Sequence, residues 1–448
     1  MQERAEEFEV RCPLHGSIPF SALERRIIDH PFVQRLRHVS QLGFADLVYP
    51  GATHTRFNHA LGVMHVAGRV FDGIVAAAPP DFHARFAPAE VARCRRLVRL
   101  AGLMHDMGHA PFSHAFEPLL PPRDRLPLPS HWYGEPPGPH DGQAAHEDYS
   151  VALIHALSAQ APDLLPPEDG QDIASLIDHR VRPTPQLAGK GDPAAGIHPM
   201  LKQIISGEID ADRMDYLRRD AHFAGVTYGY FDMERLIRSL SCQATPGGYV
   251  MTLDQNALFT YEHFIMARFH MAMQVYFHKT VLIFDHFLHK SSEAGEIPFV
   301  LDGSLENFLE AREDVVLAQL YAARREQWAS HIVNRVPFSR LVQLSELPDQ
   351  GLRAAIVDAL AAARIETVHI TTRRNVSTMG QAEGRPEHPI LVLEPMLGRT
   401  RSRTLREVSV LLEQYNRTFT IEALYCDRGD VAQGREVIGA TLQAHGWG

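Results

Sequence analysis

This chain of 448 residues has few cysteines, no long apolar run and a deficit of positive charge, and each shortage excludes a class of protein. Its four cysteines, at positions 12, 94, 242 and 426, lie too far apart for a CxxC zinc or redox pair, and they suit a reducing compartment. No uncharged apolar run approaches the length that spans a bilayer, and the N-terminus MQERAEEFEV lacks the apolar stretch of a secretory signal. We therefore expect a cytoplasmic protein that makes no membrane contact.

Basic residues are outnumbered, because 44 Arg and Lys stand against 54 Asp and Glu, for a net charge of -10. This balance disfavours strong non-specific binding of nucleic acid. The chain also lacks the GxGxxG and GxxxxGK[ST] phosphate loops. Histidine, by contrast, is abundant with 26 residues, which is the first indication of metal or acid–base chemistry.

Apolar residues at helical spacing dominate roughly the first 330 residues. Helices are expected over 90–106 and over 261–289, the latter as one long helix or two joined end to end; loops are expected over 118–142, which contains eight prolines, and over 187–199. Further on, short β-branched runs at 338–344, 367–371, 389–393 and 419–425 alternate with helical stretches at 351–364, 404–415 and 431–445. The sequence thus predicts a mainly α fold with a smaller α+β C-terminal subdomain, divided into residues 1–330 and 331–448.

The most informative segment is Ala101-Gly-Leu-Met-His-Asp-Met-Gly-His-Ala-Pro-Phe-Ser-His-Ala-Phe-Glu117. Helical spacing places His105 where a core side chain is expected, and Asp106 follows it directly. Burial of an imidazole beside a carboxylate is costly unless a divalent cation compensates both groups. The alternative for this segment alone is a histidine-rich helix end, at which His109 and His114 cap carbonyl groups.

Two other segments gain meaning only in combination with the first. A helix that begins near Asn58 places His59 on an apolar face, where a lone histidine is more often a satisfied core residue than a ligand. Polar residues recur at helical spacing in 209–220, which by itself favours a solvated face with ion pairs: Asp212, Asp215, Tyr216, Arg219 and Asp220. Two imidazoles and two carboxylates from the three segments form a set suited to Mn, Fe, Zn or Mg: His59, His105, Asp106 and Asp212.

A fourth segment, Ala145-His146-Glu147, places an acid–base residue beside a carboxylate that can orient its ring. Such a pair is common by chance. It is informative only if the fold brings it to the metal set.

The order and context of these residues resemble the HD-domain metal-dependent phosphohydrolases. One branch is matched closely, that of the deoxynucleoside triphosphate (dNTP) triphosphohydrolases, which includes bacterial enzymes and the mammalian SAM-and-HD-domain dNTPase. The resemblance covers roughly residues 8–290 and lies in these segments: 15–16, 34–37, 41–43, 49–51, 56–59, 108–114, 212–216 and 276–279.

The resemblance implies a helical HD-domain bundle and a role for each matching residue. His59, His105, Asp106 and Asp212 look like the ligands of one divalent metal, which is Mn, Fe, Zn, Ni or Mg. Around the α-phosphate, catalytic residues are implied at His109, His114, His146, Glu117 and Glu147; His146 would protonate the leaving nucleoside oxygen, and Glu117 or Glu147 would orient a ring. The implied triphosphate cations are Arg56, Arg213 and Arg268. The implied sugar pocket consists of Gln41, Leu42, Tyr216, Asp220 and Tyr276.

Within that pocket, Gln41 and Asp220 would bind the 3'-hydroxyl, while Leu42 and Tyr276 would crowd the 2' carbon and disfavour ribose. The resemblance further implies a homo-oligomer, a dimer or a tetramer, with a GTP or dNTP effector site. Its residues would be Asp29, Gln34, Arg37, Arg235, His278 and Lys279, although Phe8 stands where the family has lysine.

We therefore expect metal-dependent hydrolysis of dNTPs to deoxynucleoside and inorganic triphosphate. Two alternatives stay open at this point. One is hydrolysis of another phosphoester, such as a nucleoside monophosphate, a signalling nucleotide or short single-stranded DNA. The other is a non-catalytic regulator that binds nucleotide, although a pure binder has no need of two buried histidines and two aspartates.

Overall fold

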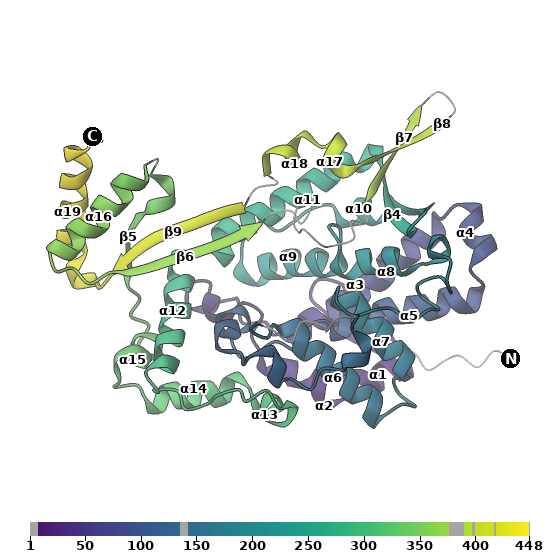
Figure 1. Cartoon of the computed structure of the whole chain (residues 1–448), viewed down its shortest axis with the longest axis horizontal. Helices are drawn as coiled ribbons and strands as arrows, with labels where there is room; N and C mark the ends of the chain where they lie inside the picture. Colours follow the sequence, from purple (N-terminus) through teal and green to yellow (C-terminus); the bar gives the residue numbers. More distant parts are fainter. Residues whose placement is uncertain are drawn as a thin grey trace. The chain divides into compact units, whose positions relative to one another are not determined.

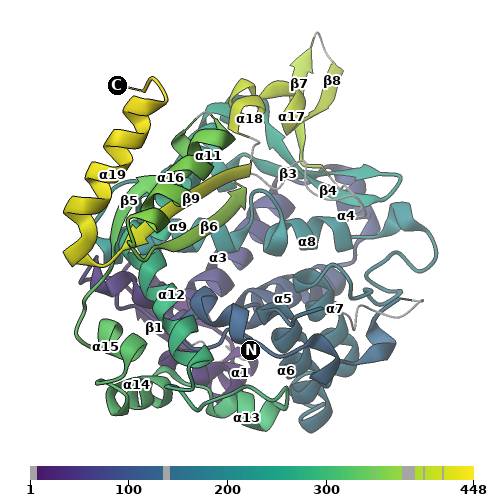
Figure 2. The same cartoon turned by 60° about the vertical axis from the view of Figure 1, so that its left-hand side comes forward.

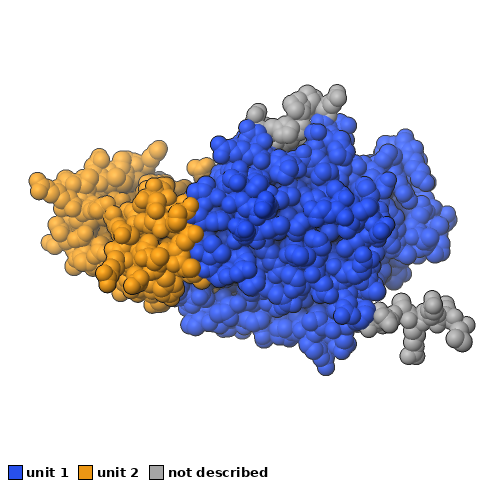
Figure 3. All heavy atoms as spheres, turned by 90° about the horizontal axis from the view of Figure 1, so that it is seen from below, with its two compact units in different colours: residues 1–271, 299–316, 377–416 blue, residues 272–298, 317–376, 417–448 orange. Residues whose placement is uncertain are grey.

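The computed structural model describes residues 8–134, 142–347, 349–375, 389–396, 399–415 and 418–447. The chain forms two compact units, which interleave along the sequence (Figure 3). The first unit consists of residues 1–271, 299–316 and 377–416, and the second of residues 272–298, 317–376 and 417–448. The predicted domain boundary at residue 330 stays a prediction.

Helices make up most of both units, which confirms the mainly α fold (Figure 1). In the first unit they are α1 (Ala22–Ile28), α2 (Pro31–Gln34), α3 (Arg56–Ala76), α4 (Pro80–Arg85), α5 (Pro88–Met104), α6 (His146–Gln160), α7 (Pro167–Ile177), α8 (His198–Ser206), α9 (Ala211–Ala224), α10 (Met233–Arg238), α11 (Leu258–Met271), α13 (Leu305–Glu310), α17 (Leu405–Val408) and α18 (Val410–Tyr415). Those of the second unit are α12 (Lys279–Glu293), α15 (Gln327–Val333), α16 (Gln350–Ala362) and α19 (Val431–Ala444), while α14 (Glu313–Ala322) begins in the first unit and ends in the second.

Three helices of the first unit form its centre, with α3 packed against both α5 and α9 (Figure 1). Helix α3 begins with a capping box in which Thr55 and Asn58 bond each other's backbone N–H groups. Proline at the first position begins α5, and Asp210 caps α9, which ends at the left-handed Gly225. The first turns of α3 and α9 and the end of α5 carry the predicted metal ligands.

Two sheets in the first unit were only partly expected. The hairpin of β1 (Phe8–Cys12) and β2 (Gly16–Phe20) and that of β3 (Leu240–Thr245) and β4 (Gly248–Asp254) have no counterpart among the predicted strands. The second hairpin continues, through a parallel pairing of β4, into β7 (Leu391–Met396) and β8 (Arg399–Thr404), in the order β3-β4-β7-β8 (Figure 2). The predicted run at 389–393 is therefore a strand, but it belongs to the first unit, because β4 offers it an open edge.

The second unit contains the three-stranded sheet β5-β9-β6, formed by β5 (Ser339–Gln343), β9 (Thr418–Cys426) and β6 (Val368–Asn375). Helices α16 and α19 cover it (Figure 2), and their buried side chains, such as Ile356, Leu360 and Ile438, share a core with Leu424 of β9. The expected α+β subdomain is thus confirmed in composition, without β7, β8, α17 and α18.

The helix expected over 261–289 consists of two helices, α11 and α12, joined by a π-helical turn at Ala272–Tyr276. The described parts of the proline-rich loop contain short 3-10 turns, at Arg123–Arg125 and Ser130–Trp132, and isolated β-bridges at Pro122 and Tyr133; its residues 135–141 lie outside the described residues. Among the helices of the described ranges, none has the length and apolar character needed to cross a bilayer.

Candidate functional site

Three helices bring the four predicted metal ligands together. His59 lies in the first turn of α3, His105 and Asp106 directly follow α5, and Asp212 lies in the first turn of α9. One ligand atom from each of His59, His105 and Asp212 lies within 4.8 Å of the others. The His59 Nε2 atom lies 2.9 Å from Asp212 Oδ1, and His105 Nε2 lies 3.5 Å from the same oxygen.

Asp106 completes this set from the buried side. Its Oδ1 lies 3.2 Å from His105 Nε2, and its Oδ2 lies 3.6 Å from His59 Nε2. The Arg56 guanidinium donates to Oδ2 at 2.5 Å. Burial disfavours the Asp106 carboxylate, yet the charges of Arg56 and His105 hold its pKa well below the ordinary value. Asp106 is therefore ionised, as a metal ligand must be.

A buried network fixes the orientation of His59. Its Nδ1 bonds Asp215 Oδ2 at 2.9 Å, which leaves Nε2 for the metal set. His15 bonds the other oxygen of Asp215 at 2.6 Å, and Arg219 bonds both oxygens at 2.7 and 2.9 Å. A Cβ on Gly62 of α3 would lie 2.0 Å from Asp215 Oδ1, so only glycine permits this approach. The polar face of α9 is thus buried here, and the solvated face favoured by that segment alone is wrong for Asp215 and Arg219, both fully buried.

The imidazole of His105 provides a direct test of whether a cation fits. Its Nδ1 donates to the Gly102 carbonyl at 2.9 Å, while its buried Nε2 has no hydrogen-bond partner among the described residues. Burial opposes a charged His59 ring, but Asp212 and Asp215 outweigh it and raise the pKa of His59 to about 10. A set of donors that attracts a proton this strongly and leaves one nitrogen unsatisfied fits a divalent cation bound by two imidazoles and two carboxylates.

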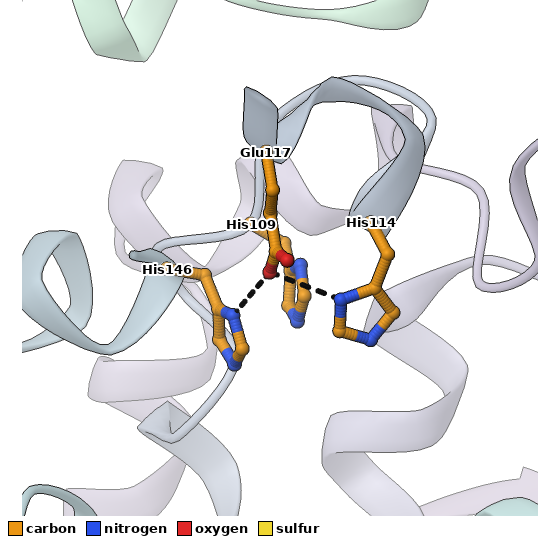
Figure 4. A group of neighbouring side chains, drawn as sticks. All are labelled: His109, His114, Glu117 and His146. Carbon is orange, nitrogen blue, oxygen red and sulfur yellow. Dashed lines mark hydrogen bonds and ion pairs between the residues drawn. The ribbon is translucent and has the colours of Figure 1, made fainter. Parts of the chain in front are cut away.

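The predicted catalytic histidines form a second cluster beside the first, and Figure 4 shows three of them around one carboxylate. Glu117 Oε1 lies 2.7 Å from His146 Nδ1 and 3.0 Å from His114 Nδ1. The rings of His109 and His146 stack with centroids 3.8 Å apart. Glu117 thus orients two rings, whereas the nearest Glu147 oxygen lies 3.5 Å from His146 Nδ1.

Electrostatics divides these histidines into two kinds. Burial opposes a charged His146, but Glu147 and Glu117 raise its pKa to about 9. Burial lowers the pKa of His114, and burial together with Arg56 and His146 lowers that of His109 far below the ordinary value. His146 is therefore the histidine that carries a proton at neutral pH, and His109 is neutral.

His54, which had no predicted role, contacts two residues of the predicted sugar pocket in the first unit. The His54 carbonyl accepts from the backbone N–H of Gln41 at 3.0 Å, and its Nε2 bonds Asp220 at 2.8 Å. The buried Gln41 Oε1 has no hydrogen-bond partner among the described residues, so a ligand hydroxyl would satisfy it. Leu42 follows Gln41 directly and is half-buried.

All three predicted triphosphate cations are paired with carboxylates, including Arg56 with Asp106. Arg268 of α11 donates to the buried Glu208 at 2.9 Å, and Arg213 forms an ion pair with Asp210. The ring centroid of Tyr216 lies 6.4 Å from that of His59, and burial raises the pKa of its phenol while the charges of Arg268 and Arg213 lower it. A cavity of about 920 Å³ opens beside them, bordered by His105, Asp106, His146, Asp212, Arg213 and Glu208.

The predicted effector residues are divided between the units. In the first, Gln34 accepts from Arg37 at 2.7 Å, Arg25 lies 3.6 Å from Asp29, and Arg235 donates to the Asn256 carbonyl at 2.8 Å. His278, Lys279 and Tyr276 belong to the second unit. The effector site, and the position of Tyr276 beside Leu42, stay predictions. Arg406 of α17 also borders the cavity.

Several residues that support the predicted site were given no role from the sequence, because each acts through a partner distant in the chain. His15, His54 and Asp215 orient other side chains, and only Asp215 had a local signal, three residues after Asp212 on one face of α9. No periodicity connects Asp215 with His15, 200 residues away.

The comparisons with known proteins agree with this geometry. Residues 56–220 match the HD domain. The chain is 29% identical over 343 residues to the uncharacterized protein YwfO of Bacillus subtilis (72% of this chain, 68% of that protein). It is 27% identical over 350 residues to the deoxynucleoside triphosphate triphosphohydrolase SAMHD1 of Danio rerio, which covers 75% of this chain and 52% of that protein. The chain thus spans about half the length of this relative.

Among solved structures, a hypothetical protein from Aquifex aeolicus superimposes with a TM-score of 0.72 at 27% identity, covering 96% of this chain and 100% of that one. The chain therefore carries an HD domain and resembles the dNTP triphosphohydrolases, as its motifs indicated.

Replacement of Asp106 tests the metal set. Asp106→Asn keeps the volume of the side chain but removes its charge, so we expect bound metal to be lost while the helical circular dichroism signal persists. Metal content is measured by mass spectrometry of the purified protein. The control is Asp72→Asn on α3, which breaks an exposed ion pair with Arg95 of α5 and should keep its metal. Full metal content in Asp106→Asn would remove this residue from the ligand set.

Proposed function

We propose that this HD-domain chain hydrolyses dNTPs to deoxynucleoside and inorganic triphosphate with one divalent metal. The observation that carries the proposal is the position of Asp106 between the two clusters. Its Oδ1 lies 3.2 Å from His105 Nε2 of the metal set and 3.4 Å from His109 Nε2 of the histidine cluster. Asp106 therefore links the residues that would hold a metal to the cluster that contains the protonated His146.

The residues of the chain have separate tasks in this reaction. A bound metal lowers the pKa of water and polarises the phosphate. His146, kept protonated by Glu117 and Glu147, is the general acid for the leaving oxygen of the nucleoside. Arg56, which reaches the metal set through Asp106, stabilises negative charge on the phosphates. Gln41 and Asp220 hold the 3'-hydroxyl, and a 2'-hydroxyl would lose its water against Leu42 and Tyr276, at a cost of about 1–3 kcal/mol.

A second candidate substrate is a phosphoester with fewer charges than a triphosphate. The ion pair of Arg268 with Glu208 favours it, because the buried carboxylate offsets a cation that the triphosphate would use. The cavity of about 920 Å³ leaves room for either substrate. We retain the dNTP as the first candidate because of the resemblance to the triphosphohydrolases and the unsatisfied Gln41 oxygen.

We further propose a homo-oligomer with a GTP or dNTP effector. The support is the resemblance, together with the bond between Gln34 and Arg37 in the proposed effector site.

The first product decides between the two substrates. Metal-loaded protein is incubated with each dNTP, NTP and dNMP, and the products are separated by ion-exchange chromatography. We expect triphosphate to leave as one unit, and dGTP to be preferred to GTP by roughly 5-fold to 150-fold because of the lost 2'-hydroxyl hydration. Pyrophosphate or orthophosphate as the first product would reject the dNTP triphosphohydrolase and favour the other phosphoester. Equal rates with dGTP and GTP would reject the sugar pocket alone.

Glu117→Gln tests the general acid. The Glu117 carboxylate raises the pKa of His146, so its removal should lower that pKa and move the alkaline limb of the kcat profile down by about 1–3 pH units. The limb moves down because a general acid is lost once pH exceeds its own pKa. Glu168→Gln, an exposed change in the first turn of α7, should leave the profile in place. An unmoved limb in Glu117→Gln would exclude His146 as the acid.

Glu208→Gln tests whether Glu208 competes with the triphosphate for Arg268. Without that carboxylate, Arg268 is free for the substrate, and we expect the KM for a dNTP to fall about 3-fold to 10-fold, or roughly 0.7–1.4 kcal/mol. The KM for a dNMP should change less. The control is Glu234→Gln, which removes an exposed pair with Arg69. A rise in the KM for the dNTP would show that Glu208 positions Arg268 instead.

A further inference from the structure

The turn between His109 and His114 has an unusual backbone. Phe112 and Ser113 are consecutive and both left-handed, with φ of 58° and 56°. A bulky residue such as Phe112 rarely adopts this conformation, and such residues persist only where the surrounding structure holds them. Both residues are buried. Something distant in the chain must therefore fix this turn, whose next residue is His114.

Glu313, at the start of α14, fixes it. One of its oxygens, Oε1, accepts from the backbone N–H of Phe112 at 2.9 Å and from that of Ser40 at 2.6 Å. The other, Oε2, accepts from the Ser40 hydroxyl at 2.6 Å. A carboxylate shielded from solvent forms strong, charge-assisted hydrogen bonds, so these three bonds hold two separate segments in register.

The two segments that Glu313 joins carry groups of the proposed active site. The Ser113 hydroxyl donates to the Ser40 carbonyl at 2.5 Å and accepts from Arg56 Nε at 2.7 Å. Arg56 is thereby held with its other end on Asp106. Ser40 also directly precedes Gln41. The backbone beside His114, the Arg56 side chain and the start of the sugar pocket thus depend on one carboxylate.

A second anchor joins the same two regions. The Arg35 guanidinium donates to the His109 carbonyl at 2.8 Å and to the Ala311 carbonyl at 2.6 Å. Its guanidinium carbon lies 4.2 Å from the centre of the Phe308 ring, which stacks on Tyr149 of α6 at 4.0 Å. The segment 308–313 is therefore connected to the turn between His109 and His114 at both of its ends, through Arg35 at Phe308 and directly at Glu313.

We propose that Glu313 is a positioning residue of the active site: through the Phe112–Ser113 turn it sets the places of His114 and Arg56. Glu313 touches neither the metal set nor the cavity that borders it. The effect on turnover rests on the proposed function, whereas the effect on the turn itself does not.

The test compares Glu313→Ala, Glu313→Gln and, as matched control, Asp314→Asn. The neighbouring Asp314 is exposed and forms an ion pair with Arg312, two residues before it. The amide oxygen of glutamine can accept both backbone N–H groups, so Glu313→Gln is the conservative variant that should rescue the turn. Three quantities are measured: bound metal, kcat and KM for the best dNTP, and hydrogen exchange of the peptide amides in 107–116.

We expect Glu313→Ala to keep its metal, to lose about 10-fold to 100-fold in kcat, and to exchange the amides of 107–116 faster. Glu313→Gln and Asp314→Asn should stay within about 3-fold of the wild type in kcat. If Glu313→Ala does not fold, Glu313→Asp, which withdraws the carboxylate by one methylene, should show the same loss of kcat and protection.

Wild-type kcat and protection in a folded Glu313→Ala would overturn the proposal, as would a loss in Asp314→Asn equal to that in Glu313→Ala. A wild-type protein inactive on every dNTP would reject the proposed function instead, and hydrogen exchange would still decide the role of Glu313.

Discussion

Asp106 carries a negative charge in the interior of the first unit, and four neighbours from two segments of the chain compensate that charge. Arg56 donates to one oxygen at 2.5 Å, and His59, His105 and His109 surround the carboxylate at 3.2 to 3.6 Å. A buried carboxylate without compensating partners costs several kcal/mol, on the order of a domain's whole free energy of unfolding. These side chains therefore cannot move independently of Asp106. The metal set and the histidine cluster are therefore one electrostatic unit.

The same constraint explains why so many charged groups lie in the core without destabilising it. Asp215 is fully buried but receives hydrogen bonds from His15, His59 and Arg219. Each partner satisfies an oxygen that would otherwise be stranded. Glycine at position 62 is the steric counterpart of this network, because any larger residue would separate α3 from α9 and His59 from its carboxylate.

Backbone geometry also fixes the positions of the histidines around Glu117. The left-handed Phe112 and Ser113 form a tight turn between His109 and His114. This turn brings both rings into the cluster around Glu117. Gly108 permits this turn to approach α6, since a Cβ there would lie 1.9 Å from the His146 carbonyl. Close approach and strain thus place three histidines from two segments around one carboxylate.

The sequence by itself predicted the helical class, most element positions after residue 330 and a candidate metal set, because helical spacing and the adjacent His105–Asp106 pair are local properties of the chain. Tertiary structure alone decided that β7 and β8 join β4, that Glu117 bonds both His114 and His146, and that Glu208 pairs with Arg268. Those outcomes depend on which distant segments share an edge or a buried charge. Periodicity carries no information about partners that lie 29, 60 or 139 residues apart, as Glu117 and His146, Glu208 and Arg268, and Thr252 and Leu391 do.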